Sequence, residues 1–192
     1  MEFVKEQEAL DVLHECGLDR APQGDDLMYL QMQDNDSVVH LHLSSEGSTV
    51  KPHDGATVVA MPKARFASIL EHIIHRLHLD QVLLIPVGKW RAVFDCVAFS
   101  LAENESWQEF DAAATVELNR RDPLLCTPAD YSTICALFEA LVNDASEQAQ
   151  GLMITCTAAP LLVELVPDGA MRLTIGNRAI ADEVLETVDV QS

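Results

Sequence analysis

The chain has 192 residues, of which 48% are hydrophobic, so it is long and apolar enough to bury a sizeable core as one domain, residues 1–192. Acidic residues number 31 and basic residues 12, which gives a formal net charge of -19. A surface of this sign repels nucleic-acid phosphates and anionic lipid headgroups, so it argues against both as partners. The same acidity suits solubility, or a basic or hydrophobic protein client.

Two further features favour a cytoplasmic location. The chain has no apolar stretch of the roughly 18 residues that a membrane span needs, and residues 1–6 lack the basic start and apolar run of a signal peptide. Five cysteines occur without a CxxC spacing, which indicates buried free thiols rather than a disulfide framework or a structural zinc site. They are Cys16, Cys96, Cys126, Cys135 and Cys156.

The first part of the chain is predicted to form a helix and three strands. The helix covers about residues 2–16, with its apolar residues on one face and a glycine directly after it. Residues 28–32 and 39–43 alternate between apolar and polar, and the turn residues 34–36 between them predict a hairpin. Residues 56–61 form a short third strand.

A second helix opens at Pro62. Three strands are predicted after it, at residues 82–87, 92–101 and 112–119. The middle one is apolar on both faces, which favours a central position or a subunit interface. The helix has the spacing of one apolar face, carried by Phe66, Ile69, Leu70, Ile73 and Leu77.

The third helix has the clearest start, because Thr127 suits the N-cap, Pro128 the first helical position and Asp130 a capping box. Three more strands and a closing helix are predicted after it, with a turn at residues 167–169 between the last two strands. The strands are residues 152–157, 161–166 and 171–175, and the closing helix carries Ile180, Val184 and Val188.

The apolar positions of the second and third helices coincide when the sequence is shifted by 65 residues, from Phe66 to Tyr131 onward. The chain therefore divides into three helix-plus-strands units, residues 1–61, 62–126 and 127–192. The fold class that follows is α+β, an antiparallel sheet with helices packed on one face and a C-terminal helix. The strand edges of such a sheet also favour a homodimer.

Histidines form the only grouping that suggests a metal. His40 and His42 share one face of a strand, and His72 and His75 lie one turn apart on the polar face of the second helix. Neither pair belongs to a recognised metal-binding motif, and both faces are expected to point away from the core. No cofactor is therefore predicted.

Asp95 is the carboxylate of most interest, because it stands in the middle of the apolar segment 92–101, and Glu164 occupies the matching place in the third unit. A buried carboxylate of this kind could act as an acid or a base, whereas an outward-facing one would be solvated. Trp90 and Trp107 flank the segment and could line a binding surface, or belong to the core. The sequence contains no GxSxG, GxGxxG or GxxxxGK[ST] motif, so nucleophilic and phosphate-loop chemistry lack support.

In the order of its elements and its low pI, the chain resembles the small, acidic type III secretion chaperones. The resemblance covers residues 2–101, read as helix, three strands, helix and two strands, and the third unit departs from it. It implies a dimer that holds an unfolded client on exposed hydrophobic grooves. No residue role follows from it.

The leading hypothesis is a non-enzymatic protein-interaction module, of a chaperone-like kind, that binds a protein client or a second copy of itself. One alternative is a small-ligand-binding protein or enzyme with a pocket around Asp95. Another is a histidine metal site at His40 and His42.

Overall fold

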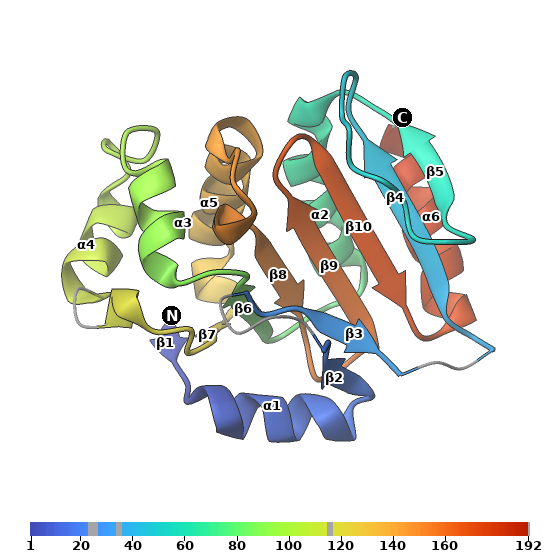
Figure 1. The fold of residues 1–192 in the computed structure, drawn as a ribbon, viewed down its shortest axis with the longest axis horizontal. Coiled ribbons are helices and arrows are strands. Elements are labelled where there is room, and N and C mark those ends of the chain that lie inside the picture. The colour runs from blue at the N-terminus through green and yellow to red at the C-terminus, as the bar shows by residue number, and fades with distance from the viewer. Residues whose placement is uncertain (23–26, 34–35, 115–116, 192) are drawn as a thin grey trace.

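An eight-stranded sheet forms the centre of the computed structural model, which describes residues 1–22, 27–33, 36–114 and 117–191 (Figure 1). Neighbouring strands pair antiparallel, except that β4 and β5 are parallel. The strand order is β1 (Glu2–Phe3), β7 (Leu124–Cys126), β6 (Val82–Pro86), β8 (Leu152–Thr155), β9 (Leu161–Val166), β10 (Ala170–Ile175), β4 (Val39–Ser44) and β5 (Thr57–Ala60).

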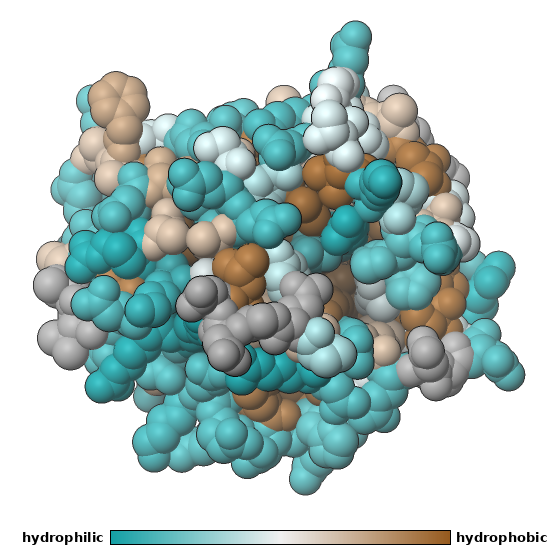
Figure 2. Space-filling model, viewed as in Figure 1, coloured by the Kyte–Doolittle hydropathy of each residue, from teal (hydrophilic) through white to brown (hydrophobic). Residues whose placement is uncertain are grey.

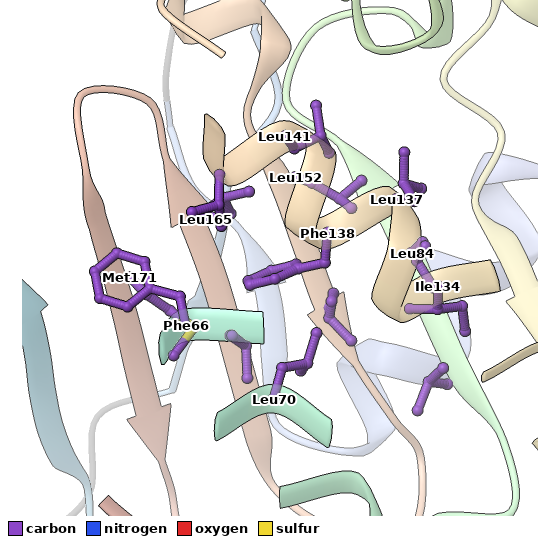
Figure 3. Close-up of a cluster of buried hydrophobic side chains, with 14 of the residues drawn as sticks. Phe66, Leu70, Leu84, Ile134, Leu137, Phe138, Leu141, Leu152, Leu165 and Met171 are labelled. Carbon is purple, nitrogen blue, oxygen red and sulfur yellow. The ribbon is translucent and has the colours of Figure 1, made fainter. Parts of the chain in front are cut away.

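Helices cover one face of this sheet and enclose the main core. The side chains of Phe66 and Phe138 are fully buried between the helices and the sheet, beside Leu84, Leu165 and Met171 (Figure 3). The predicted α+β class and the packing of helices on an antiparallel sheet are confirmed. The helices are α2 (Phe66–Arg76), α3 (Trp90–Val97), α4 (Glu105–Ala114), α5 (Tyr131–Asp144) and α6 (Arg178–Gln191). Short 3-10 turns lie at Lys63–Arg65, Glu117–Asn119, Pro128–Asp130 and Gln148–Gln150.

The opposite face of the sheet is covered over only part of its area. There α1 (Glu6–Glu15) and a two-stranded sheet of β2 (Leu18–Arg20) and β3 (Leu30–Met32) pack on β6 and β8. Because β6 and β8 are buried on both faces, their sequences are apolar runs without alternation. The rest of this face, over β9, β10 and β4, stays open to a cleft.

The strand predicted at residues 92–101 is wrong, because this segment belongs to helix α3 and the turn after it. Trp90, Val93, Phe94 and Val97 are buried at i, i+3, i+4 and i+7, which is a helical face inside a run that is apolar nearly throughout. The strand predicted at 112–119 is also wrong, since α4 ends at Ala114 and Glu117–Asn119 is a 3-10 turn. Of the three strands predicted for the second unit, only that at residues 82–87 forms, as β6, and the three-unit repeat is not confirmed.

The hairpin predicted around residues 34–36 is wrong as well. Strand β3 pairs with β2, and β4 pairs with β10 and β5. Residues 34–35 themselves lie outside the described part of the chain. The error arises because a turn-rich sequence shows that the chain reverses, but not which strands then become neighbours.

The predicted third unit matches the structure closely. The backbone N–H and the Oγ1 hydroxyl of Thr127 donate to the Asp130 carboxylate over 2.9 and 3.0 Å, and α5 follows. Strands β8, β9 and β10 then form an antiparallel meander, as expected, and α6 closes the chain. Among the described residues, no helix has the length and apolar character to cross a bilayer.

Candidate functional site

A cleft of about 950 Å³ lies over β9, β10 and β4, on the sheet face that α1 and β2 leave open. Its two walls are β3 and the segment 45–53, which runs from β4 towards β5 (Figure 1). Figure 2 is viewed onto this face and shows it hollowed between those walls. The cleft thus joins β3, β4 and the segment 45–53 to the β9–β10 hairpin, which lies more than a hundred residues later in the sequence.

The floor of the cleft carries a cross-strand ion pair. Glu164 of β9 and Arg172 of β10 stand opposite one another in register, with 3.3 Å between Glu164 Oε2 and Arg172 Nη1. Their side chains are 13% and 21% exposed, so the pair is largely withdrawn from solvent. Burial raises the pKa of the Glu164 carboxyl, and the Arg172 charge and hydrogen bond offset part of that rise. Removing either partner would leave a poorly solvated charge behind.

Histidines continue this polar row across the sheet. His42 of β4 is the register partner of Arg172, and its side chain is 1% exposed. Its Nδ1 is buried and finds no hydrogen-bond partner in the described part of the chain. Burial, and then the Arg172 charge, lower the pKa of His42, so the ring is neutral at neutral pH.

His40 and His53 meet at one side of the cleft. His40 Nδ1 lies 3.2 Å from the Thr174 hydroxyl, and the rings of His40 and His53 are 5.4 Å apart between centroids. His53 keeps an exposed side, yet desolvation of its ring and then the charge of Arg172 lower its pKa. The His53 ring therefore acts at neutral pH as a neutral donor and acceptor rather than as a cation.

The first wall of the cleft is an unpaired strand edge. Ala21 N–H donates to Tyr29 C=O and Gln33 N–H to Gly17 C=O, so the odd-numbered residues of this strand bond to β2. The backbone groups of Leu30 and Met32 therefore point away from β2, and those of Met32 face the cleft. Leu30 N–H has only the thioether of Met153 as its acceptor, at 3.3 Å. Residues 29–33 all line the cleft, as the residues of an exposed edge do.

Tyr29 adds a hydroxyl to this wall. Its side chain is half-buried, and burial together with the nearby Glu164 carboxylate raises the pKa of the hydroxyl. The group therefore remains protonated and can donate a hydrogen bond into the cleft.

The second wall is tied down at both of its ends. Ser45 donates its N–H and its hydroxyl to Gly169 C=O over 2.9 and 2.8 Å, which fixes the wall to the β9–β10 turn. Further along, Arg172 Nη2 donates to Lys51 C=O over 2.8 Å. The same guanidinium thus joins the floor of the cleft to its wall.

Gly169 is required where the wall meets the turn. Its φ is +85°, and a Cβ built there would clash with Ser45 Oγ. Gly169→Ala is expected to lower the free energy of unfolding by about 1 kcal/mol more than Gly55→Ala, because it also disrupts the Ser45 hydrogen bonds. Gly55 is the matched control, since its φ is +76° and nothing lies within 4 Å of a built Cβ. Equal losses in urea titrations of the two variants would contradict this contact.

The structure places the sequence-predicted residues away from this cleft, apart from two histidines. Asp95 is an exposed residue of α3, 67% accessible and 3.9 Å from Arg91 in an ion pair, so the expected buried acid in a pocket is wrong there. Trp90 and Trp107 are 0% and 3% exposed, within a cluster of aromatic rings, so neither forms a surface. Trp90 Nε1 donates to Asp122 C=O over 2.8 Å, which satisfies its polar atom inside the core.

The described residues do not bring the candidate histidines together as a set of metal ligands. His40 faces the cleft and His42 lies buried beneath it, while His72 and His75 are exposed on α2 on the opposite layer. Within the described residues, no group of three or more histidines, cysteines or carboxylates is arranged to hold a metal ion.

The most important cleft residues that sequence reasoning missed are Arg172, Tyr29, Lys51 and His53. Glu164 was noted only as a counterpart of Asp95. A usable signal existed for the ion pair, because the predicted turn at 167–169 aligns Val166 with Ala170 and hence Glu164 with Arg172.

Comparisons with known proteins add no assignment. No protein-family model matches the chain, and neither the curated proteins nor the solved structures contain a match to it.

Proposed function

We propose that the protein is a non-enzymatic interaction module that binds an extended segment of a client polypeptide in the cleft. The observation that carries this proposal is the outer edge of β3, which pairs with no other strand among the described residues and where Met32 faces the cleft. An extended peptide would add to that edge as a further strand, and its main-chain hydrogen bonds would supply affinity. Its alternate side chains would then meet the polar floor and supply specificity.

The charges of the cleft favour a basic client segment. Among the described residues, the carboxylates of Asp19, Glu164 and Asp168 line it, and so do the permanent cations Lys51 and Arg172. Arg172 is already engaged by Glu164 and by Lys51 C=O, whereas Glu164 forms its hydrogen bond through Oε2. Its other oxygen remains an acceptor for a lysine or arginine side chain. The net charge of -19 also attracts such a segment at long range.

This proposal keeps the unfolded client that the resemblance to type III secretion chaperones implies, but replaces the hydrophobic grooves by a polar cleft. A cytoplasmic location is proposed with it, because all five cysteines are free thiols, which suits a reducing compartment.

The test uses phage-displayed random linear peptides panned against the whole chain, followed by fluorescence anisotropy with each enriched peptide. Met32→Pro removes the N–H that faces the cleft and leaves the bonds of β3 to β2 in place. We expect enriched peptides to be rich in lysine and arginine and to bind Met32→Pro at least about tenfold more weakly, the loss expected for one or two main-chain hydrogen bonds.

Met32→Ala is the matched control, since it also loses the methionine side chain but keeps the N–H. Peptides should bind it with nearly the affinity of the unaltered protein. Failure to enrich any peptide overturns the proposal, and so does a peptide that binds both variants equally well. Thermal melts of the two variants verify that each is folded.

A further inference from the structure

The second wall of the cleft belongs to a long connection between β4 and β5, residues 45–56 (Figure 1). Because these two strands are parallel, the chain between them has to return along the length of the sheet. Residues 49–51 and His53 of this return line the cleft. No residue from 46 to 56 is buried, so the segment contributes no side chain to either hydrophobic core.

A glycine stands in a turn near each end of the segment. Gly47 and Gly55 have φ values of +81° and +76°, and nothing lies within 4 Å of a Cβ built on either. Glycine tolerates large changes of φ and ψ, and the open space around both residues leaves room for such changes. The Ser48 N–H forms a hydrogen bond across the first glycine and the Ala56 N–H across the second, each of 3.1 Å. Rotation at either glycine therefore breaks one backbone hydrogen bond.

Between the two glycines, the segment has few attachments to the sheet. Among the described residues, the hydrogen bond that joins this part to the sheet runs from Arg172 Nη2 to Lys51 C=O over 2.8 Å. The ring of His53 adds its contact with His40 of β4. A segment without buried side chains and with so few contacts opens at a low cost in free energy, while the rest of the fold stays intact.

We propose that residues 46–56 form a flap that closes one side of the cleft at neutral pH and swings away on acidification, when His53 becomes charged opposite Arg172. The flap turns about its two glycines, while Ser45 before it stays bonded to the β9–β10 turn. Its opening widens the cleft from one side. The pH of the solution thereby controls access to the cleft.

The surroundings of His53 disfavour its charged form. Desolvation of the ring and then the charge of Arg172 lower its pKa, and the two histidines of β4 act in the same direction. Asp54, the next residue along the flap, acts in the opposite direction. The titratable and charged groups around the flap are Arg172 of β10, Glu164 of β9, which is paired with Arg172, His40 and His42 of β4, and Lys51 and Asp54 of the flap itself.

Proton binding is therefore linked to opening. In the open form His53 is hydrated and titrates near the ordinary histidine pKa of 6.5. Below that pH the open form binds a proton that the closed form does not, so acidification favours the open form. One histidine shifts such an equilibrium by at most about tenfold between pH 6.5 and pH 5.5.

The test is amide hydrogen exchange, measured by NMR on the whole chain without peptide at pH 7.5 and pH 5.5. The ratio of observed to intrinsic exchange rate at the N–H groups of Ser48 and Ala56 reports the opening of the two hinges. We expect both ratios to rise on acidification, by at most about tenfold. The amides of β10 report global unfolding and should stay far more strongly protected at both pH values.

His53→Phe places an aromatic ring against His40 but cannot bind a proton, so its two ratios should change much less with pH. His75→Phe is the matched control, because His75 is exposed on α2 in the opposite layer, and it should respond as the unaltered chain does. Ratios that stay constant with pH in the unaltered chain overturn the proposal. An equal rise in His53→Phe overturns it as well, and so does protection of β10 that is no stronger than that of the flap. Because no client is present, the outcome is independent of the function proposed for the cleft.

Discussion

Arg172→Met is expected to lower the free energy of unfolding by about 3 kcal/mol at neutral pH, at the lower end of the range for breaking a buried ion pair. The substitution keeps much of the side-chain volume but leaves Glu164, which is 13% exposed, without its counter-charge. It also removes the hydrogen bond to Lys51 C=O that ties the second wall of the cleft to the floor. Urea titration monitored by tryptophan fluorescence measures the loss.

The double variant Glu164→Leu/Arg172→Met separates the effect of the unpaired Glu164 charge on stability from the effect of lost side-chain packing. It removes both partners of the ion pair, and it is expected to recover most of the stability, because well-packed apolar residues often replace a buried pair without loss. Arg178→Met is the control, since Arg178 and Asp182 form an ion pair whose side chains are 76% and 63% exposed. A loss in Arg172→Met no larger than that in the control would show that the floor pair contributes nothing.

The loss in Arg172→Met is also expected to depend on pH. The pKa of Glu164 is already raised by burial, and removing the arginine removes the two effects that lower it. A carboxyl whose pKa is raised in the folded protein binds a proton more tightly there than in the unfolded chain. The group therefore stabilises the folded protein below the unfolded pKa, and this stabilisation is lost as pH rises through the folded pKa. The variant should therefore recover stability on acidification from neutral pH towards the ordinary glutamate pKa.

The ion pair illustrates what the sequence can predict about this site. The hairpin of β9 and β10 is local, with its turn at residues 167–169, and its register alone sets Glu164 against Arg172. The walls of the cleft are different, because β3 and the segment 45–53 reach the hairpin from more than a hundred residues away in the sequence. Their positions depend on contacts such as Ser45 with Gly169, which no local pattern indicates.

The segment 92–101 shows why the candidate acid was misplaced. Its residues are apolar nearly throughout, so alternation and helical spacing fit it equally well, and the strand interpretation left both a buried and an outward-facing Asp95 open. In the structure Asp95 and Arg91 lie on the polar face of α3, and Val93 and Phe94 face the core. The same helix buries Trp90, so of the two alternatives for this residue, a binding surface or the core, the structure shows the core.

His42→Leu is expected to raise the free energy of unfolding by about 2 to 3 kcal/mol. The unaltered ring is 1% exposed and its Nδ1 has no hydrogen-bond partner in the described chain, a cost that leucine removes while adding apolar burial. His75→Leu is the matched control, because His75 is exposed on α2 and such surface changes stay within about 0.5 kcal/mol. A destabilised His42→Leu would mean that the ring makes a contact that leucine cannot replace.

The gain in His42→Leu should grow as the solution is acidified. Burial lowers the pKa of His42, so below the ordinary histidine pKa of 6.5 the unfolded chain binds a proton that the folded chain does not. That difference costs the unaltered protein stability as pH falls from 6.5 to the folded pKa, by at most about 1.4 kcal/mol per pH unit. Glu164 has the opposite slope above its unfolded pKa, so in the unaltered protein the two groups partly cancel. Urea titrations between about pH 5 and pH 8 should therefore show a difference between His42→Leu and the unaltered protein that widens as pH falls.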